Sequence, residues 1–393
     1  MSKRLFRTSY DPISTVSFYG QLKWIDFKGY RFLFDLEGRI KWIIPLKAHL
    51  WPGPDNYLRR TLGNHWLLYE SGGYAGVYEL TGRYYFPVPL YNSLSPWSAP
   101  KNSFQLDNIL ALLDELALKY PIYNTNQLKN YANQLYRVLK STLPVLPPDS
   151  INVEYDLIPI VISRGCLHNC LFCSVKTNSS FDLVSEQELQ AQMEDLQTLI
   201  GKDLINYSSL FVGQNDGLAA GVEKVAKNSC WAFDFFNIGS AIMAKKNLFL
   251  FGSATSFLSH ENKRFLIFDA LPFDYIFLNL GLESFHGPTL NMLGKPITAR
   301  EILEAFKKAM DLVSYSQKIQ ISFNFVLGKK LPKQHLQILE HKLSSAKQGL
   351  EKCIVYLSPL QNEHWRAGEL ARTVLRLKAK SRFKLYLYFI VPL

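Results

Sequence analysis

The chain has 393 residues, of which 48% are hydrophobic and 20% are charged. This apolar content supplies a large core and excludes a disordered or fibrous protein. No run reaches the roughly 18 apolar residues that cross a membrane, and the basic, polar start lacks the apolar segment of a secretory signal. We therefore expect a cytoplasmic protein with two domains, or with one large α/β domain and an addition.

The cysteines and the charge narrow the class of protein further. Five cysteines are an odd number and too few for a disulfide scaffold, so they suggest ligands or free thiols. The net charge is +11, and residues 363–393 alone hold 7 basic and 2 acidic side chains. A basic segment such as 366–384 attracts a polyanion, RNA among them, although a solvated helix face has the same composition.

The first 150 residues are predicted to form an accessory domain. Residues 1–100 are rich in aromatic residues, Gly and Pro and alternate over short runs, which is typical of a small β-rich unit. Strands are expected within 20–24, 30–36, 40–44, 66–69 and 84–88, with a hairpin turn at 36–39. Aromatic residues and arginines at 56–74 suit either the core of this unit or a ligand clamp. Helical spacing follows over 104–141, and a Pro-rich linker over 143–148.

From residue 155 onward, predicted strands alternate with predicted helices. The strands are expected at 158–163, 208–212, 248–251, 275–280, 319–326 and 353–357. The helices are expected at 186–199, 219–228, 261–270, 299–314, 333–348 and 363–380. Capping boxes mark two of the helix starts, Ser185 with Glu188 and Thr298 with Glu301. Six such units predict an α/β fold with a partial (β/α)6 TIM-like barrel over 155–393, and its chemistry at the C-terminal ends of the strands.

Three cysteines lie together just after the first of these strands. Cys166, Cys170 and Cys173 have the spacing C-x3-C-x2-C. Three thiolates in one loop are able to converge on a metal centre, and thiolates favour zinc or iron–sulfur clusters. A [4Fe–4S] cluster usually takes four cysteines, so three would leave one iron open. A structural zinc site with His168 as the fourth ligand is the alternative.

This segment resembles the signature of the radical S-adenosylmethionine (SAM) superfamily, in which an aromatic residue usually precedes the last cysteine, as Phe172 does here. The resemblance implies that the three cysteines are catalytic and hold a [4Fe–4S] cluster whose fourth iron binds SAM. It also implies reductive cleavage of SAM to a 5′-deoxyadenosyl radical, and an electron donor such as flavodoxin or ferredoxin. The substrate is RNA, a peptide or a small molecule.

Further stretches resemble the SAM-binding motifs of that superfamily. After the second strand, Gly213, Gln214, Asn215 and Asp216 stand where relatives have a Gly-Gly-Glu-like motif. Gln214 replaces the acidic residue, so Asp216 or Asn215 is expected to take the SAM amino group. An ordinary Gly-rich turn is the alternative. The departure at Gln214 also admits a degenerate protein that binds the cluster or SAM without catalysis.

The ends of three other strands complete the predicted cofactor site. Glu283 and Ser284, followed by a Leu-Asn-Met-Leu-Gly-Lys-Pro-Ile-Thr stretch at 290–298, resemble a motif of radical SAM methylthiotransferases and coproporphyrinogen-oxidase-like proteins. The resemblance implies contacts from this Glu-Ser pair to the SAM ribose and carboxylate. Ser253 is expected to bind SAM polar groups, and Asn324 and Val326 to lie against the adenine. A surface Glu and a plain buried strand are the alternatives.

Two cysteines remain outside the cluster. Cys230 and Cys353 have no partner at cluster-ligand spacing, and both are expected to be buried, inert thiols. We therefore predict no second cluster. Residues 1–150 contain no Asp-x-His-x-x-Gly motif and no βαβ pattern, so we predict no cobalamin.

Overall fold

The computed structural model describes residues 21–45, 111–141, 147–153, 155–168, 170–173, 180–346, 351–360, 363 and 367–388. Five short strands outside these ranges are described as strands only: β1 (Ser14–Val16), β5 (Trp51–Pro52), β6 (Leu58–Leu62), β7 (His65–Leu67) and β8 (Pro87–Val88). The predicted aromatic and arginine-rich block at 56–74 otherwise lies outside the described residues. Among the described helices, none has the length and apolar character to cross a bilayer.

A sheet with seven parallel strands forms the centre of the fold. Its strands are β9 (Leu157–Ile160), β12 (Ser209–Val212), β13 (Asn247–Ser253), β14 (Tyr275–Glu283), β15 (Ile319–Leu327), β16 (Cys353–Pro359) and β17 (Lys384–Tyr388). They pair in that order, and β8 adds an antiparallel strand beside β17. The six predicted strands are confirmed. They could be recognised because strands that are covered on both faces are mostly apolar along their length. The prediction missed β17 as a seventh parallel strand.

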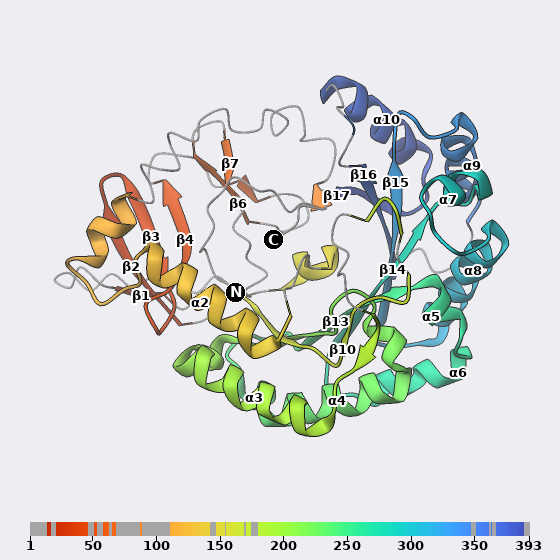
Figure 1. Ribbon diagram of the computed structural model, residues 1–393. Helices are drawn as coiled ribbons and strands as arrows, with labels where there is room; N and C mark the ends of the chain where they lie inside the picture. The colour runs from red at the N-terminus through yellow and green to blue at the C-terminus, as the bar shows by residue number, and fades with distance from the viewer. Residues whose placement is uncertain are drawn as a thin grey trace.

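Helices follow one another along the outer side of this sheet (Figure 1). They are α3 (Glu186–Ile200), α4 (Val222–Phe235), α5 (Ala254–Leu258), α6 (Asn262–Phe265), α7 (Gly287–Met292), α8 (Ala299–Tyr315), α9 (Lys333–Ser345) and α10 (Ala367–Lys380). The capping box of Thr298 and Glu301 is complete. At Ser185 only half of the predicted box forms, because the Glu188 carboxylate pairs instead with Arg164 and Lys140.

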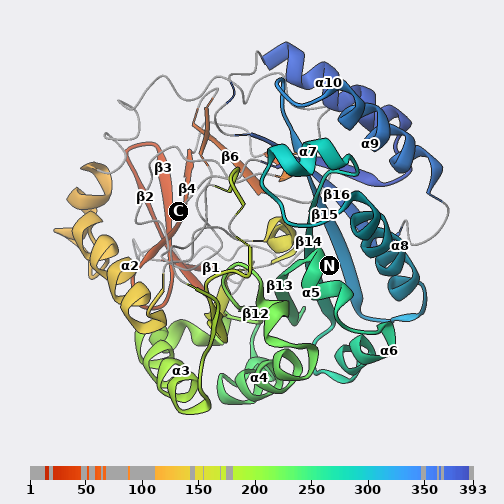
Figure 2. The same cartoon turned by 45° about the vertical axis from the view of Figure 1, so that its right-hand side comes forward.

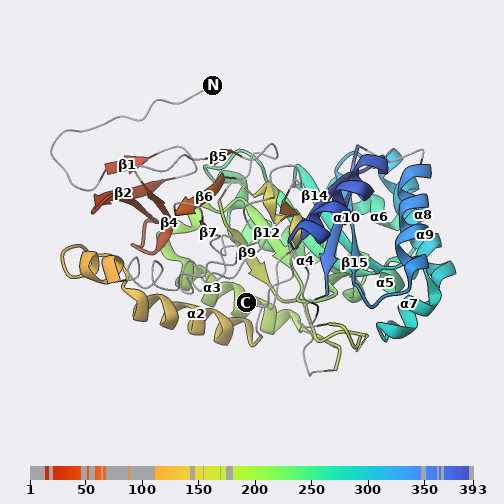
Figure 3. The same cartoon turned by 90° about the horizontal axis from the view of Figure 1, so that it is seen from above.

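The first residues form a separate antiparallel sheet of β1, β2 (Leu22–Phe27), β3 (Tyr30–Phe34) and β4 (Ile40–Pro45). The predicted hairpin turn is confirmed, and Gly38 takes a φ of 85° that favours glycine. Of the predicted helical region, residues 111–117 are helical and α2 spans Thr125–Leu139. Figure 3 shows this sheet at one end of the molecule and α8 and α9 at the other. Leu22 and Trp24 nevertheless belong to the same hydrophobic core as the parallel strands.

A cluster of buried charges joins this sheet to the start of the parallel one. The Arg39 guanidinium lies 2.6 Å from the Asp35 carboxylate, donates to the carbonyls of Leu199 (3.0 Å) and Ile200 (2.8 Å), and lies 3.9 Å from Asp203. All three charged side chains are at most 1% exposed. Beside these charges, Lys41 forms a second buried ion pair with Asp156, the residue just before β9. We call Asp35, Arg39, Lys41, Asp156 and Asp203 the buried ionic cluster.

The predicted linker contains structure at its C-terminal end. Residues 142–146 lie outside the described residues, but a 3₁₀ helix, η2, spans Pro148–Asn152. This helix lies on the inner side of the parallel sheet, opposite the outer helices (Figures 1 and 2). It is therefore part of the wall around the inner side of the sheet and not a free connection.

Candidate cofactor site at the ends of the parallel strands

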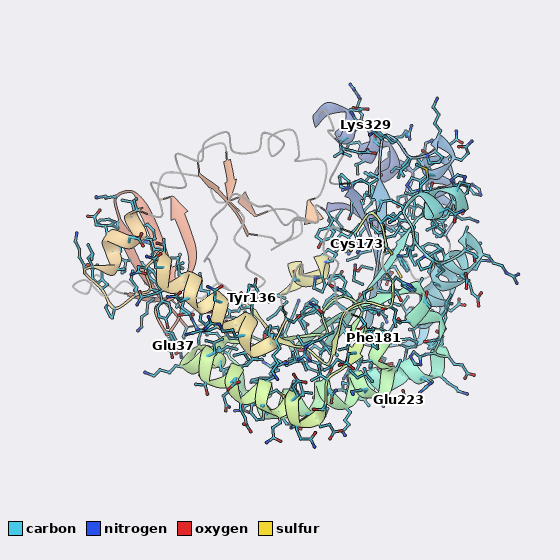
Figure 4. All side chains as sticks on the ribbon, in the orientation of Figure 1. Glu37, Tyr136, Cys173, Phe181, Glu223 and Lys329 are labelled. Atoms are coloured by element: carbon cyan, nitrogen blue, oxygen red, sulfur yellow. The ribbon has the colours of Figure 1, made fainter. Side chains whose placement is uncertain are left out.

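A cavity of about 150 Å³ opens where the parallel strands end. The cysteine loop contributes to its wall, as do the segment after β12, the C-terminal end of β13 and residues of β14 and β15. Cys173 lies on the inner side of the sheet, whereas Glu223 of α4 lies at the outer rim (Figure 4). The cavity is lined by Cys166, His168, Cys170, Phe172, Cys173, Asn215, Asp216, Phe251, Gly252, Ser253, Asn279, Gly281, Glu283, Lys295, Asn324 and Tyr388.

The loop that carries the three cysteines is fixed to its surroundings by backbone hydrogen bonds. The Leu171 N–H donates to the carbonyl of Leu293 (3.0 Å), and the Cys173 N–H donates to the carbonyl of Cys170 (3.3 Å). Gly294, at φ 61°, lies so close that a Cβ there would stand 2.5 Å from Cγ of Leu171. The loop and the residues after α7 therefore hold each other in place.

The thiols face the cavity from a partly desolvated position. Burial raises the pKa of Cys170 to about 11, and burial also raises the pKa of Cys166. These thiols therefore keep their protons near neutral pH until a metal centre displaces them. Within the described residues, no three His, Cys, Asp or Glu side chains are gathered closely enough to hold one metal ion. The His168 ring nitrogen Nε2 lies 3.1 Å from Oγ1 of Thr255.

The segment after β12 contributes two of its four predicted residues to the cavity, Asn215 and Asp216. The Asp216 carboxylate is buried, accepts the Ser256 hydroxyl at 2.6 Å and caps a short 3₁₀ helix, η4 (Gly217–Ala220). Burial raises its pKa. Gln214 points elsewhere, because its Oε1 accepts the Gly165 N–H at 3.2 Å and so holds the start of the cysteine loop. Gly213 forms the tight turn against Gly217.

Glu283 lies at the end of β14 in a strained conformation. Its φ is 64°, at a shift in register between β14 and β15, and its side chain is 10% exposed. Lys295 Nζ lies 3.1 Å from its carboxylate and donates to the Gly281 carbonyl at 2.8 Å. Strained residues of this kind concentrate at functional sites. Lys295 belongs to the stretch at 290–298 that resembles the family motif, but it was not predicted as a site residue.

The structure separates the other predicted contacts. Ser253 and Asn324 line the cavity, and so does Phe172, whereas Ser284 and Val326 are not among its described lining residues. Ser284 is fully buried, and its Oγ lies 2.7 Å from Nδ1 of His335. His335 in turn donates from Nε2 to the Val326 carbonyl at 2.8 Å, which leaves the Ser284 hydroxyl as the donor to Nδ1.

Two of the lining residues that were not predicted, Asn279 and Tyr388, lie in strands. Asn279 is a polar residue within the otherwise apolar stretch 276–282 of β14, and Tyr388 ends β17. Asn279 is fully buried and exchanges hydrogen bonds with Asn324 across the two strands. An amide inside an apolar run costs free energy unless it has hydrogen-bond partners. A polar Asn279 within such a run was therefore the feature of the sequence that indicated a site residue.

The remaining thiols and the basic segment lie away from the cavity. Cys353 is buried and its pKa is raised by burial to about 12, as expected of an inert thiol. Cys230 is only partly buried, so the expectation of two buried thiols was wrong for this one. In α10, Arg376 lies 3.4 Å from Glu340 and Lys380 also pairs with Glu340. Part of the basic excess there is therefore neutralised within the chain.

Comparisons with known proteins give resemblances of fold. No protein-family model and no curated protein sequence matches the chain. A methylornithine synthase (PylB) resembles it with a TM-score of 0.37 and 14% identity, over 71% of this chain and 74% of that one. The cobalamin-dependent S-adenosylmethionine radical enzyme OxsB, with SAM bound, gives a TM-score of 0.34 and 15% identity over 61% of this chain.

The match covers 34% of OxsB, so the chain spans about a third of that protein. OxsB is described as a cobalamin-dependent S-adenosylmethionine radical enzyme. Similarity at these TM-scores supports no inference about this chain. The function therefore has to be inferred from the residues that line the cavity.

Proposed function

We propose that this chain is a radical SAM enzyme, which holds a [4Fe–4S] cluster on Cys166, Cys170 and Cys173 and binds SAM beside it. The observation that carries the proposal is that these three cysteines, Asp216 and Glu283 line one cavity although they come from three separate segments of the chain, the cysteine loop, the turn after β12 and the end of β14. Three thiol donors with acidic and amide side chains opposite them fit an iron–sulfur cluster with an adjacent amino-acid ligand.

The residues around the cavity have distinct roles in this proposal. Asp216, already oriented by Ser256, accepts hydrogen bonds from an ammonium group, and Glu283, oriented by Lys295, accepts them from vicinal hydroxyls. Phe172 and Phe251 exclude water from the cysteine side of the cavity. The chemistry that the bound cofactors supply is one-electron reductive cleavage of SAM to methionine and a 5′-deoxyadenosyl radical.

Metal and product analysis test the proposal. Anaerobic reconstitution should give about four iron and four sulfide per chain, and dithionite with SAM should release 5′-deoxyadenosine. Replacing Cys170 by Ala should remove the iron, whereas replacing Cys353 by Ala, outside the cavity, should not. A colourless protein that holds one zinc would contradict the proposal and favour the Cys3His site. A reconstituted protein that binds SAM without releasing deoxyadenosine would favour the degenerate alternative.

The proposal extends to the electron donor and to the class of substrate. A flavodoxin or ferredoxin is the class of donor that we propose. RNA as substrate gains support from the basic residues of α10, but two of them already pair with Glu340. RNA binding should weaken steeply with salt and on neutralising Arg372 and Lys378. An affinity that is independent of salt would favour a peptide or small molecule.

A further inference from the structure

A buried carboxylate lies directly behind the wall of the cavity. Asp149 of η2 accepts the Ser322 hydroxyl at 2.5 Å and the Tyr356 hydroxyl at 3.1 Å. Its side chain is 1% exposed, and burial raises its pKa to about 6. This residue directly follows the predicted linker at 143–148, and it is not among the residues that line the cavity.

A chain of hydrogen bonds runs from this carboxylate to the cavity. The Asn279 amide nitrogen donates to Oγ of Ser322 at 2.6 Å, and the Asn324 amide nitrogen donates to Oδ1 of Asn279 at 2.6 Å. Asn279 stands opposite Ser322 in the register of β14 and β15, so these side chains share the inner face of the sheet. Asn324 and Asn279 both line the cavity.

The charge of Asp149 sets the direction of this chain. An ionised carboxylate only accepts hydrogen bonds, so Ser322 must give its one proton to Asp149. Ser322 then accepts from the Asn279 amide nitrogen, and the Asn279 carbonyl is left to accept from Asn324. One N–H of Asn324 donates to no described residue and is available to a ligand. A protonated Asp149 is also a donor, so the Ser322 hydroxyl is no longer forced to point toward it.

We propose that Asp149 is a positioning residue for SAM, which in its ionised form fixes the orientation of the Asn324 carboxamide through Ser322 and Asn279. This inference rests on the proposed function. Asn324 stands opposite Gly281, two residues before Glu283, so a ligand held by Glu283 reaches the same part of the wall. The group of the ligand that meets Asn324 is a neutral hydrogen-bonding group.

Of Asp149 and the side chains that face it, Asp149 is the group that titrates near neutral pH. They are the Tyr356 phenol from β16, the Ser322 hydroxyl from β15 and the Asn279 amide from β14. The Tyr356 ring packs against those of Tyr386 and Tyr388 on β17. Burial raises the pKa of Tyr356 well above its ordinary value, so this phenol stays protonated.

Equilibrium binding of SAM to the reconstituted protein at different pH values tests the inference. In the unmodified protein the affinity should fall about tenfold between neutral pH and one unit below the transition, because only the ionised form is competent. Asp149→Asn keeps the shape but should remove this transition. Ser322→Ala keeps the carboxylate and interrupts the relay, so binding should be weak at every pH. Tyr356→Phe removes a donor to the carboxylate and should move the midpoint to higher pH.

The possible failures are distinguishable. If Asp149→Asn keeps the pH profile of the unmodified protein, another group such as Asp216 causes the transition and the inference is overturned, while the proposed function stands. SAM binding that does not change with pH in the unmodified protein overturns it as well. A protein that takes up iron but binds no SAM overturns both. If Asp149→Asn does not fold, the Tyr356→Phe midpoint decides: an unchanged midpoint contradicts the relay.

Discussion

Removing the Arg39 guanidinium is the most direct test of how the N-terminal sheet is held. Arg39→Met keeps much of the volume but removes the cation between Asp35 and Asp203, both fully buried. Burial disfavours the charged form of Arg39, but attraction to the Tyr131 phenol, Asp35 and Asp203 outweighs it and raises its pKa. The variant therefore leaves two buried carboxylates without that counter-charge.

The expected loss is large for one substitution. Breaking a buried ion pair by removing one partner costs about 3–5 kcal/mol, because the other charge stays desolvated. Two carbonyls at the end of α3, those of Leu199 and Ile200, also lose a charged donor, and the Tyr131 ring loses a cation 4.5 Å from its centroid. These losses share the same atoms and do not add, so we expect about 4 kcal/mol in all.

Urea unfolding followed by far-ultraviolet circular dichroism measures this loss. Arg31→Met is the matched control, because Arg31 makes a bidentate pair with Asp26 in the same sheet but is partly exposed. It should cost at most about 1 kcal/mol. Adding Asp203→Asn to Arg39→Met should recover part of the loss. If Arg39→Met and Arg31→Met differ by less than about 1 kcal/mol, the buried ionic cluster does not anchor the sheet as described.

Three further changes test the cavity. Gly294→Ala should lower the iron bound on reconstitution, because its Cβ would press on the cysteine loop, whereas Gly287→Ala meets nothing within 4 Å and should leave it unchanged. Lys295→Met should lower the midpoint of urea unfolding by removing the ammonium beside the buried Glu283; an unchanged midpoint would refute this pairing. Burial in the folded protein raises the pKa of Asp149 to about 6. The free energy of unfolding should therefore fall by about 3 kcal/mol as the pH rises from about 4 to about 6. The difference in pH-dependent unfolding between the unmodified protein and Asp149→Asn measures that slope.

The sequence predicted the parallel sheet well because its strands are covered on both faces. Runs such as Leu157–Ile160 are apolar throughout and contrast with the helices that follow them. The seventh strand was missed because Lys384–Tyr388 alternates an exposed Lys with buried residues, a pattern that fits an edge strand of either kind of sheet. The start of α4 was predicted three residues early, since the turn after β12 continues as η4.

The site was predictable where one local motif carried it and not where distant segments meet. The cysteine loop, Asp216 and Glu283 are local signals. Ser284 follows Glu283 directly but is not among the described lining residues, because its hydroxyl bonds the ring of His335, a residue far along the chain. Asp149 directly follows an apparent linker and was not recognised, because nothing in the local sequence shows that the chain passes along the inner side of the sheet.

The pairing of β8 with β17 has a consequence for how the chain folds. Pro87 and Val88, from the first quarter of the sequence, cover the edge of the strand that is synthesised after every other strand of the sheet. Until β17 has paired with β16, β8 has no strand of this sheet to pair with. The sheet therefore closes its exposed edge through a contact of very high sequence separation, which is a slow step in folding. An unprotected strand edge invites pairing between chains, so crowded refolding should favour aggregation over the native form.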